Sequence, residues 1–228
     1  MKPILIFAYL FAINSVIFSQ IIEKPNYSSA SHPMVVQRVE FSQNQTIITI
    51  SLQNQSESGY FCADKNIYLV DALSGKKYKL INAKDIPVCP ETYYFKAKGE
   101  VLEFQLFFPK MEGIPKYINI IEDCRTNCFC IKGVVLDKDF NKEIDLGFNN
   151  YSSGNMDLAL SVFEHTLKSY PDYQFGMLYS NIIQILAEKN DIPKAKGWFK
   201  ILSKSGFQDK NEVVNRLKQF DYYSKLIF

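Results

Sequence analysis

The chain has 228 residues, a length that corresponds to one large domain or two small ones. Its 26 basic residues nearly balance 24 acidic residues, which argues against a dedicated nucleic-acid-binding protein because such proteins are usually clearly basic. Hydrophobic residues make up 47% and aromatic residues 14%, enough for a packed core. With only two histidines, a histidine-rich metal or active site is not expected.

Residues 1–19 have the pattern of a secretory signal peptide. Lys2 supplies a positive charge, residues 4–13 form an unbroken apolar run, and Ser19 is a small residue suited to the position before cleavage. We therefore expect cleavage between Ser19 and Gln20. The apolar stretch is too short for a bilayer span, and no later segment is long and apolar enough. These features predict an exported chain without a membrane span, in the periplasm or outside the cell.

The next part of the chain alternates between polar and apolar residues. Residues 20–34 are polar and rich in serine and proline, so we expect a flexible leader there. Residues 35–138 show a period of two, most clearly at 46–52 and 101–108. Shorter apolar runs, separated by turn residues, lie at 67–70, 77–80, 117–121 and 128–136. The pattern predicts roughly seven or eight strands in an antiparallel β-sandwich, with a small barrel as the alternative.

Residues 141–228 have helical spacing instead, so the predicted fold class is α+β. Pro171 separates two pairs of expected helices. Asp191, followed by Ile192 and Pro193, is a typical helix start with an aspartate N-cap and a proline in the first turn. A last helix over residues 211–225 is expected to act as a cap.

The helical part contains an internal repeat. Matching residues stand 36 positions apart: Gly154-Asn155 with Asn190-Asp191, Ala159 with Ala195, and Phe163 with Phe199. This pattern resembles the tetratricopeptide repeat (TPR), whose 34-residue unit has small residues where two helices cross, an aromatic residue beside them and a proline after the second helix. The resemblance covers repeats at about residues 140–173 and 176–209.

The match to the family is partial. Glu143 stands where the family has an aromatic residue, Thr166 replaces a usual alanine, and Asn190 replaces the turn glycine. The second copy also lacks the closing proline, and there are two repeats where stable arrays usually have three or more. An ordinary helix bundle with accidental spacing is the alternative.

The resemblance implies a non-enzymatic scaffold or interaction protein that binds a protein or peptide partner in a concave groove. In this family the first helix of each hairpin faces that groove. On this basis we expect Asn150, Tyr179 and Gln184 to contact the partner. The alternative is that the two repeats only pack against the β part. Residues 67–71 and 75–80 also resemble β modules that precede such repeats in exported bacterial proteins, but this similarity carries no activity.

Two other functions stay open at the level of sequence. Tyr93 and Tyr94 follow a proline-rich turn and are candidates to stack on sugar rings, which would make the β part a carbohydrate-binding module. A hydrolase is the second alternative, because paired carboxylates are brought together in space and not in sequence. The chain has no G-x-S-x-G motif and no Walker-type or dinucleotide-binding glycine motif. We therefore expect no enzyme, no catalytic residue and no cofactor.

Five cysteines, an odd number, lie in the β part, and export would permit disulfides. Two bridges and one free thiol allow many arrangements. Cys124 and Cys128 flank a predicted turn and are placed to meet across it, and we favour Cys62 with Cys89 as the longer bridge. The spacing of Cys124, Cys128 and Cys130 departs from paired C-x₂-C zinc ligands, so no metal site is expected.

Overall fold

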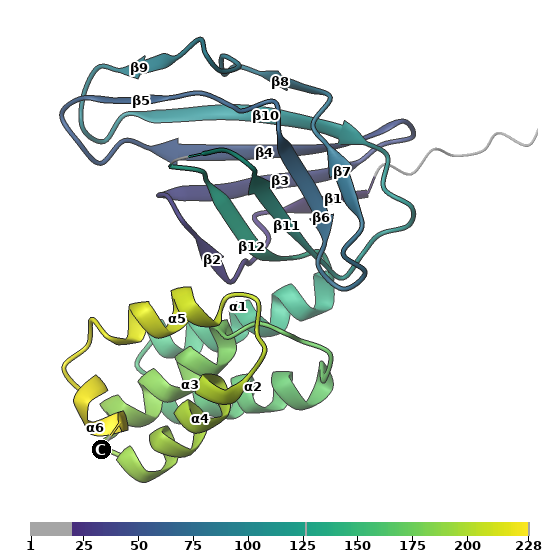
Figure 1. Cartoon of the computed structure of the whole chain (residues 1–228). Coiled ribbons are helices and arrows are strands. Elements are labelled where there is room, and N and C mark those ends of the chain that lie inside the picture. Colours follow the sequence, from purple (N-terminus) through teal and green to yellow (C-terminus); the bar gives the residue numbers. More distant parts are fainter. Residues whose placement is uncertain (1–19, 126, 228) are drawn as a thin grey trace, which may run out of the picture.

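The computed structural model describes residues 20–125 and 127–227, so the predicted signal peptide at residues 1–19 lies outside the described residues. The fold is mixed α+β, with antiparallel sheets followed by helices (Figure 1). We call residues 20–135 the β lobe and residues 138–227 the helical lobe. No helix in these described ranges is long and apolar enough to cross a membrane.

The β lobe contains two five-stranded antiparallel sheets and a two-stranded one. The first sheet has the order β1 (Gln20–Glu23), β3 (Met34–Phe41), β4 (Gln45–Gln53), β10 (Val101–Pro109) and β8 (Asn82–Lys84). The second has the order β2 (Ser29–Ala30), β12 (Cys130–Val135), β11 (Tyr117–Glu122), β6 (Ile67–Asp71) and β7 (Lys77–Lys79). The third pairs β5 (Gly59–Phe61) with β9 (Tyr93–Phe95).

One apolar core joins the two large sheets. The alternation predicted at 46–52 and 101–108 is confirmed, because every second side chain of β4 and β10 is buried. The apolar ones among these buried residues form one cluster with side chains of the second sheet, including Ile118, Ile120 and Val134. The short strands β5, β8 and β9 were not predicted from the sequence.

Residues 20–34, expected to be a flexible leader, instead contribute a strand to each large sheet. Strand β1 pairs with β3, and β2 pairs with β12. Between them, the Asn26 N–H donates to Asn141 Oδ1 of the helical lobe at 2.8 Å, and the Val135 N–H donates to Asn26 O at 2.8 Å. The polar composition of this segment is compatible with order because its backbone groups have partners that are remote in the sequence.

Strand β12 carries a bulge that adapts the second sheet to the helices. Ile118 pairs with Val134 and Ile120 pairs with Ile131, so two residues of β12 lie opposite Asn119. Gly133 has a φ of 66° there, and its N–H donates to Asn119 Oδ1 at 2.8 Å. A Cβ at Gly133 would approach the Phe175 ring to 2.8 Å, so both the backbone conformation and the packing require glycine.

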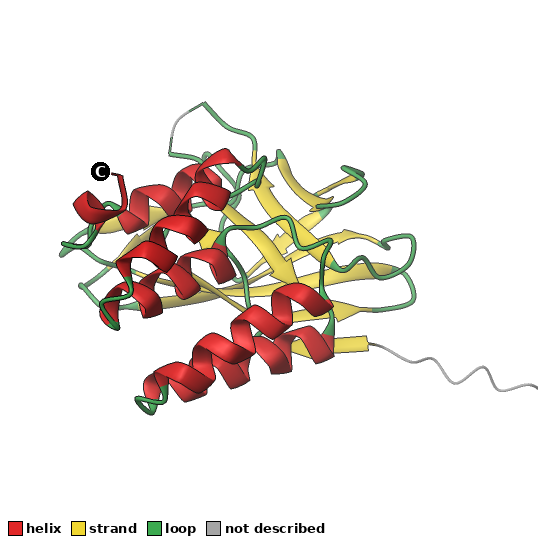
Figure 2. Ribbon diagram, turned by 90° about the horizontal axis from the view of Figure 1, so that it is seen from below, coloured by secondary structure: helices red, strands yellow, loops and turns green. Residues whose placement is uncertain are grey.

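The helical lobe consists of α1 (Lys138–Ser152), α2 (Met156–Ser169), α3 (Met177–Glu188), α4 (Ile192–Lys204), α5 (Lys210–Leu217) and α6 (Tyr223–Ile227). The predicted helix start at Asp191 is confirmed, because its side chain accepts the Lys194 N–H at 3.3 Å. The expected capping helix at 211–225 is instead two short helices, since the first ends at Leu217. Figure 2, seen from the helical side, shows the helices lying across the strands.

The matched positions of the repeat lie where helices pack closely. Ala159 of α2 and Ala195 of α4 are fully buried, and Phe163 and Phe199 lie one turn beyond them. In the first hairpin, Gly147 of α1 faces Phe163, and the ring occupies the space that a Cβ at position 147 would take.

Aromatic side chains fill the seam between the lobes. The Tyr117 ring of β11 lies 5.9 Å from the Phe140 ring of α1 and 5.6 Å from the rings of both Tyr173 and Phe175. Phe140 also stacks on Tyr170 at 4.2 Å. Each such pair contributes about 0.5–1.5 kcal/mol beyond the burial of its surface. The seam therefore holds the helices against the outer face of the second sheet.

A buried carboxylate, Asp209, joins three segments at the edge of this seam. It accepts a hydrogen bond from the Ser28 hydroxyl of the β lobe, and another, of 2.6 Å, from the Gly176 N–H just before α3. Asp209 itself directly precedes α5, which is the third segment. Burial raises the pKa of the Asp209 carboxyl above its ordinary value, although both hydrogen bonds act in the opposite direction.

The contact between Gly147 and Phe163 makes a testable prediction with a matched control. Gly147→Ala and Gly197→Ala both replace glycine inside a helix, but only position 147 meets a neighbouring ring, whereas nothing lies near a Cβ at position 197. Inside a helix, alanine is more favourable than glycine by about 1 kcal/mol, and both variants gain this. Overpacking costs about 1–3 kcal/mol, and only G147A has this cost. In urea denaturation we expect G147A to be less stable than G197A. Equal stabilities would show that the ring does not restrict position 147.

A second prediction concerns pH and Asp209. Because the pKa is higher in the folded state than in the unfolded chain, stability falls as pH rises from about 4 through the folded pKa. Asp209→Asn removes the buried charge and keeps an oxygen for the Gly176 N–H. We therefore expect the stability of D209N relative to the unsubstituted protein to rise with pH across that range. Asp209→Ala loses both bonds and should be less stable than D209N by about 1–3 kcal/mol. Urea denaturation over a pH series measures the stabilities of both variants. A stability difference between D209N and the unsubstituted protein that does not change with pH would contradict the expected pH dependence.

Candidate functional site

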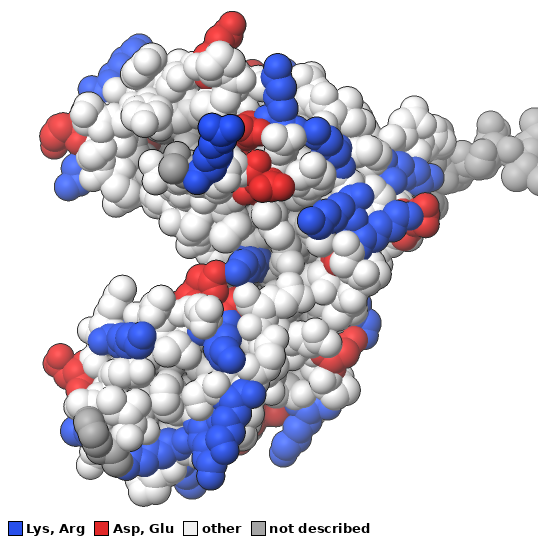
Figure 3. All heavy atoms as spheres, in the orientation of Figure 1, with Lys and Arg blue, Asp and Glu red and all other residues white. Residues whose placement is uncertain are grey.

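A cleft of about 970 Å³ lies between the two lobes, and we call it the inter-lobe cleft. The molecular surface is indented where the lobes meet (Figure 3). One wall is formed by residues 24–30 and 32–37, together with Ser51, Gln53 and Val101 of the first sheet. The other wall consists of Phe148 of α1, Met177 and Asn181 of α3, and Arg216 of α5.

Both walls combine apolar and hydrogen-bonding side chains. On the β side, Val35 and Val101 are 42% and 56% exposed. On the helical side, Asn181 Nδ2 is buried without a hydrogen-bond partner, and Arg216 Nη2 donates to Ser180 Oγ at 2.8 Å. The cleft can therefore offer a ligand both apolar contacts and hydrogen-bond donors.

None of the three residues expected to contact a partner lines this cleft. The Tyr179 ring packs against Phe207 at 4.8 Å and Trp198 at 5.6 Å. Gln184 Nε2 donates to the Tyr151 hydroxyl and to Glu188 Oε1, both at 2.9 Å. Asn150 Nδ2 donates to Leu146 O, one turn earlier in its own helix.

The helix phase explains this difference. Position 179 is rotated by about 160° from Met177 around α3, so its side chain points toward α4. Position 184 shares the face of Met177 but lies about 10 Å further along the axis, next to α1. Met177 and Asn181 are four residues apart and therefore lie on the same face of α3. Sequence reasoning missed this spacing as a signal for a shared binding surface. The β wall gives no local signal, since residues 24–37 reach these helices only through the tertiary fold.

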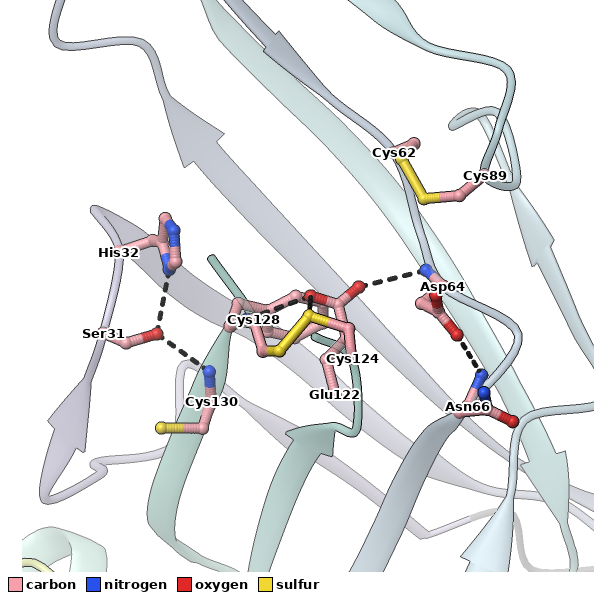
Figure 4. Close-up of a disulfide and its surroundings, with 11 residues drawn as sticks. Ser31, His32, Cys62, Asp64, Asn66, Cys89, Glu122, Cys124, Cys128 and Cys130 are labelled. Carbon is pink, nitrogen blue, oxygen red and sulfur yellow. Dashed lines mark hydrogen bonds between the residues drawn. A yellow bond between two sulfur atoms is a disulfide. The ribbon is translucent and has the colours of Figure 1, made fainter. Parts of the chain in front are cut away.

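A second cleft, of about 1220 Å³, lies at the far end of the β lobe, and we call it the disulfide cleft. Cys62–Cys89 and Cys124–Cys128 are disulfides with Cα separations of 5.3 and 5.5 Å, so the structure joins both favoured pairs (Figure 4). Cys62, Cys89 and Cys124 line the cleft, and Cys128 does not. Cys130 is a free thiol whose backbone N–H donates to Ser31 Oγ at 2.8 Å.

The two tyrosines proposed to stack on sugar have different environments. Tyr94 is 71% exposed and lines the disulfide cleft, whereas the Tyr93 hydroxyl donates to Glu100 at 2.6 Å and its ring packs on Phe95. The pairing of β5 with β9 places Tyr60, which is 70% exposed, directly opposite Tyr94, with ring centroids 6.4 Å apart. Sequence reasoning missed Tyr60 because it lies 34 residues earlier on another strand.

Glu122 is the buried carboxylate of the disulfide cleft. It accepts the N–H groups of Asp64 and Phe129, both at 3.0 Å, and its Oε2 lies 3.9 Å from Cys124 Sγ (Figure 4). Burial raises the pKa of Glu122, although the two backbone bonds lower it. Its position on β11, in phase with Ile118 and Ile120, explains why it points inward. The carboxylate ties two loops together at this end of the lobe.

The histidines do not form a recognisable catalytic group. His32 Nδ1 lies 2.8 Å from Ser31 Oγ, and burial lowers the pKa of His32. This contact joins His32 to the neighbouring serine and not to a carboxylate that would orient the ring, as a serine triad requires. His165 lies on α2, with Nε2 3.3 Å from Ser169 Oγ. Among residues 20–125 and 127–227, no group of three or more histidine, cysteine or acidic side chains is arranged to hold a metal ion.

Comparison of the chain with protein-family models, with curated proteins and with solved structures finds no match.

Proposed function

We propose that the chain is an exported, non-enzymatic interaction protein that binds a protein or peptide partner in the inter-lobe cleft. The observation that carries this proposal is the lining of the cleft. Val35 and Val101 are exposed on the β wall, and Phe148 and the mostly buried Met177 line the helical wall. These apolar side chains lie in one concave surface with a similar number of polar ones. Such a surface is typical of a binding site.

The proposal treats the β lobe as a β-sandwich and the helical lobe as a TPR-like pair of hairpins. The core shared by the two large sheets supports the sandwich. The close approach of α1 and α2 at Gly147, and the buried Ala159 and Ala195, support the repeat assignment. Two hairpins make a short groove, and here the β lobe supplies the opposite wall.

Export to the periplasm or the outside of the cell is part of the same proposal. The pattern of residues 1–19 supports it, and two disulfides fit an oxidising compartment.

Exposure-matched substitutions test the cleft. A photo-crosslinking amino acid at Gln53, within the cleft, should capture a partner in the native cell. Val35→Glu with Val101→Glu places charge on the apolar β wall and should abolish the crosslink. Leu158→Glu with Ile201→Glu is the control. These side chains have similar exposure, 58% and 52%, and lie on α2 and α4 outside the cleft. The control should leave the crosslink intact. Equal crosslinking by the two double variants would contradict the assignment.

Carbohydrate binding is a second candidate, favoured by one observation. Tyr60 and Tyr94 form an exposed cross-strand pair beside the disulfide cleft, and apolar sugar faces pack on such rings. Tyr93 is excluded from this role because its ring packs inward.

A glycan array tests this candidate. If it is correct, the protein binds at least one glycan, and Tyr60→Ala with Tyr94→Ala removes the signal, whereas Tyr68→Ala, on the second sheet, does not. An array without any bound glycan would rule it out.

A further inference from the structure

The charged groups of the inter-lobe cleft are all of one kind. Its lining includes Lys24 and Arg216, together with His32, and contains no aspartate or glutamate. In the described ranges, neither Lys24 nor Arg216 takes part in an ion pair. This is unexpected for a chain that is almost neutral as a whole, because acidic side chains are nearly as numerous as basic ones.

Acidic residues near the lobe junction have partners other than Lys24 and Arg216, although two of them bond to residues of the cleft lining. Asp145 accepts from Asn26 Nδ2 at 2.9 Å, and Glu212 pairs with Lys132 at 2.5 Å. Asp209 is buried against Ser28 and Gly176, and Glu188 accepts from the Tyr151 hydroxyl. None of these acidic side chains forms an ion pair with Lys24 or Arg216, so both positive charges are available to a ligand in the cleft.

The two cations lie on opposite walls and are accompanied by apolar surface. Lys24 belongs to the segment after β1, and Arg216 belongs to α5. Val35, Val101 and Phe148 lie in the same lining, and Asn181 Nδ2 lacks an acceptor. A ligand that satisfies this surface carries negative charge, apolar side chains and hydrogen-bond acceptors. An extended peptide with acidic and apolar side chains has all three, since its backbone carbonyls are acceptors.

We propose that the inter-lobe cleft selects an acidic, partly apolar peptide segment of its partner, with Lys24 and Arg216 contacting its acidic side chains. This inference rests on the proposed function and adds the chemistry of the partner. Complementary charge on both walls would speed association and reject basic segments.

Synthetic peptides of equal length test the inference on the purified protein. One alternates Glu with Leu, one alternates Gln with Leu, and one alternates Lys with Leu. We expect the Glu peptide to bind at least about tenfold more tightly than the Gln peptide, which corresponds to 1.4 kcal/mol. We expect the Lys peptide not to bind, and the preference for Glu to weaken with added salt.

Lys24→Gln with Arg216→Gln should remove the preference for the Glu peptide. Arg216→Lys should keep most of it, because the charge remains. Lys196→Gln with Lys200→Gln, on α4 outside the cleft, should keep it fully. Circular dichroism of each variant confirms that it is folded.

The outcomes separate this inference from the proposed function. If the Gln and Glu peptides bind equally, and Val35→Glu with Val101→Glu abolishes both, the cleft is a binding site and the acidic preference is wrong. If heparin or single-stranded DNA binds as tightly as the Glu peptide, the cleft is a general polyanion site and the inference is also wrong. If no peptide binds and the Gln53 crosslinker captures no partner, the proposed function itself fails.

Discussion

Strand β11 is buried on both faces, and the arrangement of the two lobes depends on this constraint. Ile118 and Ile120 face the core of the β lobe, whereas Tyr117 and Asn119 face the helices. Asn119 accepts the Gly133 N–H and donates to Gln208 Oε1 at 2.7 Å, and Gln208 Nε2 donates to Ala72 O at 2.8 Å. Separation of the lobes would expose the aromatic seam and leave these polar groups without their partners.

The shape of the inter-lobe cleft is set by the contacts that hold β11 against the helices. The residues that line it belong to elements fixed by the seam or by the pairing of β1 and β2 with the two large sheets. A cleft whose walls are already ordered imposes little loss of conformational entropy on its own side when a partner segment binds. The main entropic cost of binding would then fall on the partner.

The sequence was most informative where a signal is local. The alternation in β4 and β10 and the N-cap at Asp191 needed only neighbouring residues. The cleft was not predictable in this way, because Lys24 and Arg216 are brought together by strand pairing and helix packing across most of the chain. Tyr60 and Tyr94 are a similar case, since only the pairing of β5 with β9 makes them neighbours. Composition made residues 20–34 resemble a leader, but their order comes from partners in β3, β12 and α1.

The bond between Ser28 and Asp209 has a consequence for the order of folding. The two residues are 181 positions apart, so the segment between β1 and β2 is anchored by the residue that directly precedes α5. Such non-local closure slows folding because a long loop must be ordered before the contact forms. During synthesis from the N-terminus, the joint between the β lobe and the helices therefore stays incomplete until Asp209 has left the ribosome.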